Sequence, residues 1–386
     1  MLGEKTVYFD NAATTFPKPE AVYSCMDTVN RNLAVNAGRG SYRLAREATN
    51  IIDEARLNLG KLINVKNTKD IIFAPSATIA LNQIILGLEW NEYQTVYVSP
   101  FEHNAVMRPL HYIQAKFGIN IIKIPFNKGT LELDYDNMKA MFASKKPDYV
   151  FLSHISNTTG YILPVEQITA EAKKYSAVVI LDCAQSMGLL PIDIQEMNAD
   201  FLVYAGHKTL YAPFGIGGFI KNSNIVLKKV LNGGTGSDSL NLDMPDTSPM
   251  AFEAASPNVI AVAGLNAALK WKRGLSHNEV LIAEKKLSDY LILQLNEITG
   301  IKQYLPRDLQ RHIGIVSFNL NGYSADDLGT ILDQDFNIAV RTGYHCAPFI
   351  HELLETKEKK GTVRVSISFF NTKQEIDYLV NALKEI

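Results

Sequence analysis

The sequence predicts an α/β fold with a mainly parallel sheet, because short apolar runs alternate with helical patterns over the first two thirds of the chain. Seven runs are expected to form strands: IIFA (71–74), TVYVSP (95–100), INIIKI (119–124), DYVFLSH (148–154), VVILD (178–182), FLVYA (201–205) and GGFI (217–220). Segments with helical period lie between several of them; one contains Ala48, Ile52 and Ala55. The strands lack polar alternation, so we expect a seven-stranded sheet with helices on both faces.

Two domains are expected for a chain of 386 residues. A stretch rich in Gly, Ser, Asp and Pro at 232–258 interrupts the α/β pattern and predicts a long loop at a boundary. A helical segment at 259–273 follows, and then strand-like runs at 314–320 and 362–368. We therefore predict a large domain over 21–258 and a smaller α+β domain over 259–386.

The composition argues against several classes of partner. A formal net charge of -2 provides no field that would attract nucleic acid or an anionic membrane. No apolar run approaches the roughly 18 residues that span a bilayer, and the N-terminal MLGEKTVYFD lacks a signal-peptide pattern. The three cysteines are far apart and contain no C-x-x-C pair. We expect a cytoplasmic protein without disulfides, a metal site, or a nucleic-acid or membrane partner.

Polar residues follow several predicted strands, and ligands of open α/β sheets bind beyond the carboxyl ends of the strands. Ser76, Ala77 and Thr78 open an amphipathic helix whose free N–H groups would suit a phosphate, although a simple N-cap is the commoner role for such a turn. His103 and Asn157 follow two further strands. A structural histidine and a turn asparagine are the ordinary alternatives there.

Asp182 and Lys208 are the most informative of these residues. Asp182 ends an apolar run, where an ionised carboxylate is costly without a cation or strong donors; a magnesium ligand and a helix N-cap are the alternatives. Lys208 follows FLVYA in AGHK, at the same edge of the sheet. Pyridoxal 5'-phosphate would use the whole set, because it needs a lysine for its carbonyl, a carboxylate for its pyridine nitrogen, an aromatic partner for its ring and a phosphate site. Lys208, Asp182, His103 and the turn at 76–78 meet these needs.

Eight motifs follow one another along nearly the whole chain: YFDNAATTFPKP, EHNAV, SNTTG, DCAQS, GHK, FEAASPN, RTGYHCAP and VRVSISFFNT. With them the chain resembles the class V aminotransferase-fold enzymes, and among these the cysteine desulfurases and selenocysteine lyases of the short-loop class. The resemblance implies a fold-type I homodimer that binds pyridoxal 5'-phosphate in its large domain. It also implies that an N-terminal arm, residues 1–20, joins the small domain.

The resemblance assigns roles to the residues that match these motifs. Lys208 would form the Schiff base, Asp182 would face the pyridine nitrogen and Gln185 would donate to the ring oxygen. His103 would stack on the ring and assist proton transfers. Ser256 would reach the phosphate of the neighbouring subunit, which makes the dimer part of the site. The full implied cofactor set is Lys208, Asp182, Gln185, His103, His207, Thr78, Ala77, Asn157 and Ser256.

The same resemblance places the substrate near Arg364, Asn157, Arg341 and Ala13. Arg364 would bind the α-carboxylate with its planar guanidinium, and a surface strand arginine is the alternative. Cys346 matches the nucleophile of the short-loop class. Its neighbours Arg341 and His345 would supply positive charge that favours the thiolate, although most buried cysteines are inert. Cys25 and Cys183 are expected to be structural.

The implied activity converts L-cysteine to L-alanine, with the sulfur taken by Cys346 as a persulfide and passed to an acceptor protein. A selenocysteine lyase would use the same residues with L-selenocysteine. Another class V activity, transamination or epimerisation, would make Cys346 incidental. A non-catalytic scaffold that binds the cofactor is the remaining alternative, and the presence of both Lys208 and Asp182 argues against it.

Four positions depart from the family pattern and place the chain in a divergent branch. Ala205 stands where relatives commonly have serine, and Ala251 stands where arginine is frequent. Ala255 replaces a frequent glycine, and Tyr344 replaces the histidine of many short-loop members.

Overall fold

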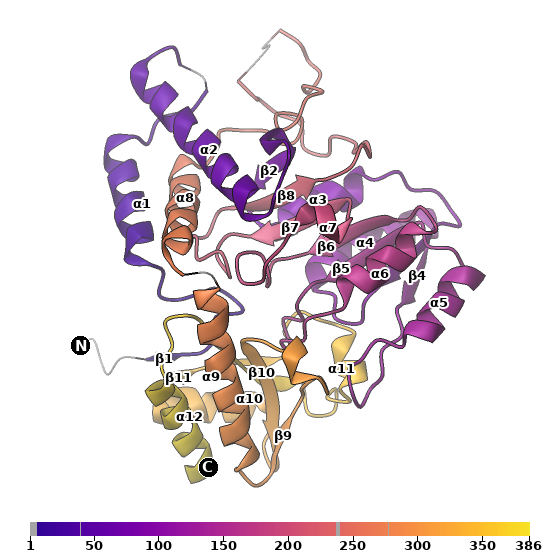
Figure 1. Cartoon of the computed structure of the whole chain (residues 1–386), viewed down its shortest axis with the longest axis vertical. Helices are drawn as coiled ribbons and strands as arrows, with labels where there is room; N and C mark the ends of the chain where they lie inside the picture. Colours follow the sequence, from indigo (N-terminus) through magenta and orange to yellow (C-terminus); the bar gives the residue numbers. More distant parts are fainter. Residues whose placement is uncertain (1–5, 39, 237–239, 277) are drawn as a thin grey trace.

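The computed structural model describes residues 6–386 except 39, 237–239 and 277. Figure 1 shows two parts, one built around the long sheet and one formed by the C-terminal third of the chain. Residues 1–5 of the expected arm and 237–239 of the expected loop lie outside the described residues.

The larger part contains the predicted seven-stranded sheet, with strand order β2-β8-β7-β6-β5-β3-β4. Strand β8 is antiparallel to both of its neighbours, and the other pairs are parallel. Each of the seven apolar runs forms one strand, so the prediction of a mainly parallel sheet is confirmed. The strands are β2 (Ile71–Ala74), β3 (Thr95–Val98), β4 (Asn120–Lys123), β5 (Tyr149–Ser153), β6 (Val178–Asp182), β7 (Phe201–Ala205) and β8 (Gly217–Lys221).

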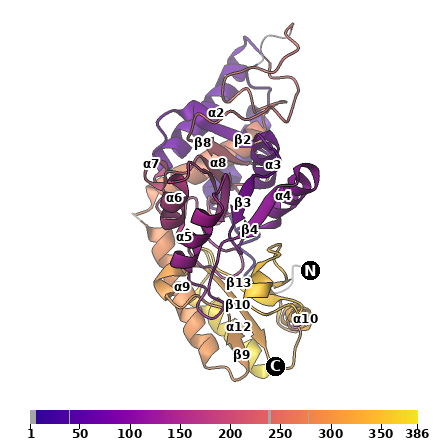
Figure 2. The ribbon, with the colours of Figure 1, turned by 90° about the vertical axis from the view of Figure 1, so that its right-hand side faces the viewer.

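Both faces of this sheet are buried. In β5, Val150 and Leu152 enter one apolar cluster, whereas Tyr149 and Phe151 enter another on the opposite face. Figure 2 shows α3 and α4 on one side of β3 and β4, and α5 and α6 on the other. This two-sided cover explains why the strands lack polar alternation. The helices of this part are α1 (Glu20–Asn32), α2 (Arg43–Leu62), α3 (Ala77–Gly87), α4 (Asn104–Phe117), α5 (Tyr135–Ser144), α6 (Val165–Lys173), α7 (Ile194–Met197) and α8 (Val259–Gly274).

Helix α8 packs against α1 and α2, and its apolar residues belong to the same buried cluster as theirs. Figure 1 shows the three helices side by side, far from the C-terminus. The sequence-based division assigns this helix to the small domain, because it follows the long loop. Its packing favours a boundary after α8 rather than at residue 258.

The smaller part contains an antiparallel sheet of order β12-β13-β10-β9 and a buried cluster of its own. Near the N-terminus, β1 (Val7–Tyr8) pairs in parallel with β11 (Ile338–Ala339) in a separate two-stranded sheet. Residues 7–10 therefore lie with the C-terminal third. The other elements are α9 (Glu279–Asn296), β9 (Ile301–Gln303), β10 (Ile315–Leu320), α10 (Ala325–Phe336), β12 (Arg341–Gly343), α11 (Ile350–Leu353), β13 (Thr362–Ser366) and α12 (Lys373–Glu385).

Across the described ranges, no helix combines the length and the apolar character that a membrane span requires.

Candidate active site

A pocket lies where the carboxyl ends of the parallel strands meet. Its lining includes eight of the nine residues predicted to bind the cofactor, namely Ala77, Thr78, His103, Asn157, Asp182, Gln185, His207 and Lys208. The other lining residues are Ser76, Ala105, Ser153, Ile155, Ala184 and Ala205. The acid and the amine singled out from the sequence thus share one pocket.

Asp182 is the last residue of β6, in register with Ser153 of β5 and Val203 of β7. One carboxylate oxygen accepts a hydrogen bond from the backbone N–H of Ala184 at 2.9 Å. Burial raises the pKa of Asp182, while this hydrogen bond and the charge of Lys208 lower it. The effect of burial is the larger, so a positively charged donor at this carboxyl group would stabilise its ionised form.

Lys208 follows β7 at the same edge. Burial lowers the pKa of its amine to about 8, although the carboxylate of Asp182 acts in the opposite direction. The charges of Arg364 and Arg341 lower it further. A substantial fraction of this amine is therefore neutral, and able to act as a nucleophile or base, in mildly alkaline solution.

His103 forms the N-cap of α4, with Nδ1 accepting the backbone N–H of Ala105 at 2.9 Å. Since Nδ1 is the acceptor, the ring proton is on Nε2. Burial lowers the pKa of His103 to about 4, and the charge of Lys208 adds to this. His103 is therefore neutral at physiological pH and can donate from Nε2.

The N-terminus of α3 forms another wall of the pocket. The hydroxyl of Ser76 accepts the N–H of Ile79 at 3.2 Å, so the N-cap alternative is confirmed for this residue. Ala77 and Thr78 remain directed to the pocket. Gly217 packs against this turn so closely that a Cβ would lie 2.9 Å from the backbone N of Ala77. The close approach of β8 thus leaves room only for glycine.

His207 adds an unsatisfied group to the pocket. Its Nδ1 is buried and has no hydrogen-bond partner within the described part of the chain. Its ring stacks on Phe214, with centroids 4.6 Å apart, and burial lowers its pKa to about 3. A buried ring nitrogen without a partner is a place where a ligand group can bind.

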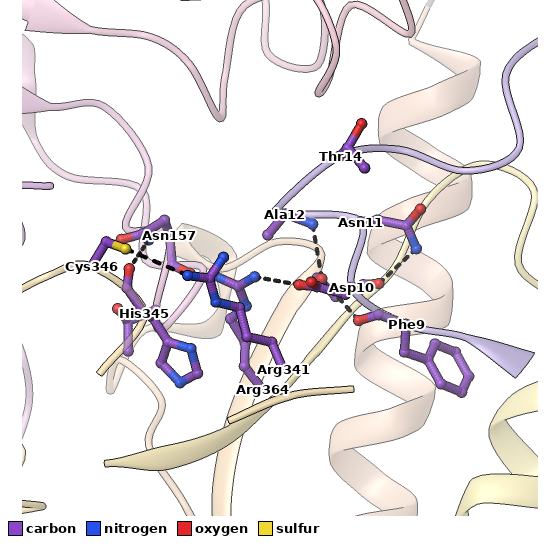
Figure 3. A network of polar contacts seen from close by, with 12 residues as sticks. Phe9, Asp10, Asn11, Ala12, Thr14, Asn157, Arg341, His345, Cys346 and Arg364 are labelled. Carbon is purple, nitrogen blue, oxygen red and sulfur yellow. Dashed lines mark hydrogen bonds and ion pairs between the residues drawn. The ribbon is translucent and has the colours of Figure 1, made fainter. Parts of the chain in front are cut away.

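Arg341, Arg364 and Cys346 form a second cluster beside the pocket (Figure 3). Arg341 of β12 and Arg364 of β13 are directly opposite each other in the sheet register. Arg341 Nη2 lies 3.4 Å from the sulfur of Cys346. The predicted proximity of a cation to this thiol is confirmed for Arg341.

Backbone contacts tie the Cys346 loop to the pocket. The N–H of Asn104 donates to the carbonyl of Cys346 at 2.7 Å, next to His103. Asn157 Nδ2 donates to the carbonyl of His345 at 2.7 Å. Cys346 itself is half-buried and has a positive φ of 56°. The thiol is therefore held in a turn that borders the pocket, as its loop position predicts.

The expectation that His345 adds positive charge beside Cys346 is wrong. Its Nε2 lies 2.8 Å from the hydroxyl of Thr362, and Figure 3 shows the ring directed away from the sulfur. Burial holds the pKa of His345 well below its usual range. The ring is therefore neutral, and Arg341 is the cation that contacts the thiol.

Three further predicted residues lie in different settings. Gln185 donates one N–H to the carbonyl of Ala12 at 2.8 Å, so only its second N–H is available for a ring oxygen. Ala13 is not in the pocket lining, and its N–H bonds to the carbonyl of Asp10 at 3.1 Å. Ser256 is exposed outside the pocket of its own chain, where its hydroxyl accepts from Asn36 at 3.2 Å.

The four residues that depart from the family pattern lie in different surroundings. Ala205 lines the pocket, where a serine would add a hydroxyl. Ala251 is buried, and Tyr344 is half exposed. Ala255 has a φ of +79°, a region that favours glycine, so the alanine at this position is strained.

Sequence reasoning assigned no role to two acidic residues next to the site. Asp10 pairs with Arg364, Oδ1 to Nη2, at 2.6 Å. Glu102 is fully buried and accepts the N–H of Ser153 at 2.6 Å, and burial raises its pKa to about 7. Asp10 lies within the motif YFDNAATTFPKP, and Glu102 is the first residue of EHNAV. A carboxylate directly after the apolar VYF was the available signal for Asp10.

Comparisons with known proteins show which family the chain is similar to. Residues 7–379 match the family model described as aminotransferase class-V. A probable cysteine desulfurase of Pyrococcus abyssi is 32% identical over 100% of this chain and 95% of its own length. The apo structure of a cysteine desulfurase from Thermococcus onnurineus NA1 has a TM-score of 0.91 and 30% identity, over 98% of this chain and 94% of that chain. The cysteine desulfurase CsdA (S-sulfonic acid) from Escherichia coli has a TM-score of 0.86 and 28% identity, with the same shares covered.

Proposed function

The chain belongs to the class V aminotransferase family, and on that premise we propose that it is a pyridoxal 5'-phosphate-dependent cysteine desulfurase. It converts L-cysteine to L-alanine and takes the sulfur as a persulfide on Cys346. The observation that carries this proposal is the thiol of Cys346, 3.4 Å from Arg341 in a turn bonded to the pocket that contains Lys208 and Asp182. The similarity to cysteine desulfurases over the full length of the chain supports it.

The residues of the pocket fit pyridoxal 5'-phosphate. The buried Nδ1 of His207 and the buried Oδ1 of Asn157 lack hydrogen-bond partners among the described residues. Both atoms are therefore available to bind polar groups of a ligand. The N-terminus of α3 offers N–H groups to a phosphate. Lys208 would hold the aldehyde carbon, Asp182 the ring nitrogen, and Ala77, Thr78 and His207 the phosphate. When bound, the cofactor supplies an electron-accepting ring conjugated to the substrate's α-carbon.

The protein's own residues bind the substrate and move protons. Arg364 and Arg341 bind the α-carboxylate of L-cysteine, for which a planar guanidinium is well suited. The Lys208 amine removes the proton from the α-carbon, because burial leaves much of it neutral. His103 can donate a proton only from Nε2.

Cys346 performs the sulfur transfer. Its thiolate forms a bond to the sulfur of L-cysteine as the bond between that sulfur and the β-carbon breaks. The electron pair of the broken bond stays on the β-carbon side and is protonated there. The α-carbon regains the proton that the Lys208 amine removed, which gives L-alanine. The Cys346 persulfide then passes its outer sulfur to a thiol of an acceptor protein, and a small-molecule reductant would release it as sulfide.

The activity is tested by incubating the purified holoenzyme with L-cysteine, L-selenocysteine and a thiol reductant. Equal amounts of alanine and sulfide from L-cysteine are the expected products. A keto acid as the main product would instead identify a transaminase, and turnover of L-selenocysteine alone would identify a selenocysteine lyase.

Binding of the cofactor is expected to depend on pH through Lys208. The neutral amine attacks the aldehyde, so the association rate constant of the cofactor-free protein rises about tenfold per pH unit below pH 8 and levels off above it. Stopped-flow absorbance between about pH 6.5 and 9.5 measures this profile. Asp182 raises the pKa of Lys208, so Asp182→Asn should move the plateau to lower pH. A flat profile for the unmodified chain would contradict the assignment.

The active unit is a homodimer in which Ser256 reaches the cofactor phosphate of the neighbouring subunit. Large apolar side chains support this, since Phe214, Val226, Leu240 and Leu242 are 65%, 82%, 97% and 100% exposed in the single chain. Ser256→Ala is expected to speed cofactor dissociation several-fold, and analytical ultracentrifugation should show a dimer. A fully active monomer would rule out the shared site.

A further inference from the structure

Residues 9–18 of the N-terminal arm connect Arg364 to the loop that contains Lys208. At one end, Ser366 of β13 donates its N–H to the carbonyl of Phe9 at 2.7 Å, and the N–H of Ala12 donates to the Ser366 hydroxyl at 2.9 Å. At the other end, Lys18 Nζ donates to the carbonyl of His207 at 2.7 Å. The arm is therefore fixed both to the strand that carries Arg364 and to the residue before Lys208.

Asp10 is the charged residue of this arm that contacts Arg364. The guanidinium is 1% exposed, and Asp10 is the one carboxylate within ion-pair distance of it in the described residues. An uncompensated charge in such a buried place is costly, so the pair keeps Arg364 charged and in place. Figure 3 shows the guanidinium between Asp10 on one side and Asn157 and Cys346 on the other.

The pair leaves Arg364 able to bind a second carboxylate. Of its five N–H groups, one on Nη2 goes to Asp10 and one on Nη1 goes to the carbonyl of Asn157 at 2.8 Å. The Nε–H is buried and has no partner anywhere in the described chain. A buried donor without an acceptor points to a ligand that supplies one.

We infer that Asp10 is a positioning residue for substrate recognition: from the N-terminal arm it holds the Arg364 guanidinium in the orientation that binds the substrate's α-carboxylate. The inference rests on the proposed function, since it takes an amino acid as the ligand of Arg364. Asp10 acts through the arginine and touches neither the cofactor nor the reacting atoms.

The test compares L-alanine with ethylamine, which is L-alanine without its carboxylate, as ligands of the holoenzyme. Dissociation constants come from the change in the visible absorbance of the bound cofactor. Asp10→Asn is expected to raise the dissociation constant of L-alanine about tenfold, which is the scale of a charge-assisted hydrogen bond. The dissociation constant of ethylamine should change by no more than about twofold. In turnover, KM for L-cysteine rises by a similar factor while kcat stays within about threefold. Equal weakening of both ligands, or of neither, would overturn the inference.

A second variant, Asn11→Ala, separates loss of the Asp10–Arg364 ion pair from loss of arm anchoring. Asn11→Ala loosens the same arm, because Asn11 Nδ2 donates to the Ser366 carbonyl at 2.8 Å, but it leaves the ion pair intact. It should change the two dissociation constants equally. If Asn11→Ala selectively weakens L-alanine as Asp10→Asn does, anchoring of the arm explains the effect and the inference fails. Should Asp10→Asn not fold, Asp10→Glu keeps the charge on a longer side chain, and the same selective loss is expected at smaller size.

Arg364→Met distinguishes failure of this inference from failure of the proposed function. It should weaken the binding of L-alanine at least as much as Asp10→Asn does and leave the binding of ethylamine unchanged. If Arg364→Met does not affect L-alanine, the assignment of the substrate carboxylate to Arg364 is wrong. If Arg364→Met weakens L-alanine but Asp10→Asn does not, only the role of Asp10 is wrong.

Discussion

Cys346→Ser is expected to remove nearly all sulfur transfer and to leave the cofactor site intact. We expect release of alanine and sulfide from L-cysteine to fall roughly 100-fold or more, as is usual for loss of a nucleophile. A serine hydroxyl is a far weaker nucleophile toward sulfur and cannot replace the Cys346 sulfur beside Arg341. The variant should still bind the cofactor, because Cys346 is not part of the pocket lining. Product analysis and the absorbance spectrum measure the two effects separately.

The other two cysteines provide the matched controls for this variant. Cys183 is buried, and burial raises the pKa of its thiol; Cys25 lies in α1, and burial raises its pKa as well. Cys25→Ser should retain full activity. Normal desulfuration by Cys346→Ser would show that the nucleophile has been misassigned.

Lys208→Ala is expected to eliminate turnover and the absorbance of the lysine-bound cofactor together. The amine both holds the cofactor and moves the α-proton, and loss of a general base alone costs about 100-fold to 10,000-fold. No neighbouring residue of the pocket lining carries a second amine. Steady-state assays and absorbance spectra of the purified variant measure both losses.

Lys146→Ala is a suitable control for Lys208→Ala, since Lys146 is exposed and does not line the pocket. It should leave activity and spectrum unchanged. A Lys208→Ala protein with an unaltered spectrum would mean that another residue anchors the cofactor.

The sequence was sufficient to predict the seven-stranded sheet and the pocket at the carboxyl ends of its strands. The strands of a two-sided parallel sheet are continuous apolar runs, and VVILD and FLVYA coincide with β6 and β7. Because parallel strands end at one edge, the order of residues along the chain was enough to bring Asp182 and Lys208 together. The confirmed part of the prediction is thus the part that depends on strand periodicity and direction.

The remaining features depend on contacts between distant segments, which periodicity does not report. Helix α8 follows the loop at 232–258 but packs on α1 and α2. The Asp10–Arg364 pair joins residues 354 positions apart. His345 is adjacent to Cys346 in sequence, yet the turn at these residues directs its ring to Thr362. Each of these features depends on tertiary packing, which the local sequence does not specify.

The proposed function requires that Cys346 receives the sulfur of L-cysteine. The most direct measurement is a single turnover of the holoenzyme without reductant, followed by mass spectrometry of its peptides. We predict one alanine released per site and one added sulfur atom on the peptide that contains Cys346. Alanine released with that peptide unchanged, or with the sulfur on Cys25 or Cys183, would contradict it.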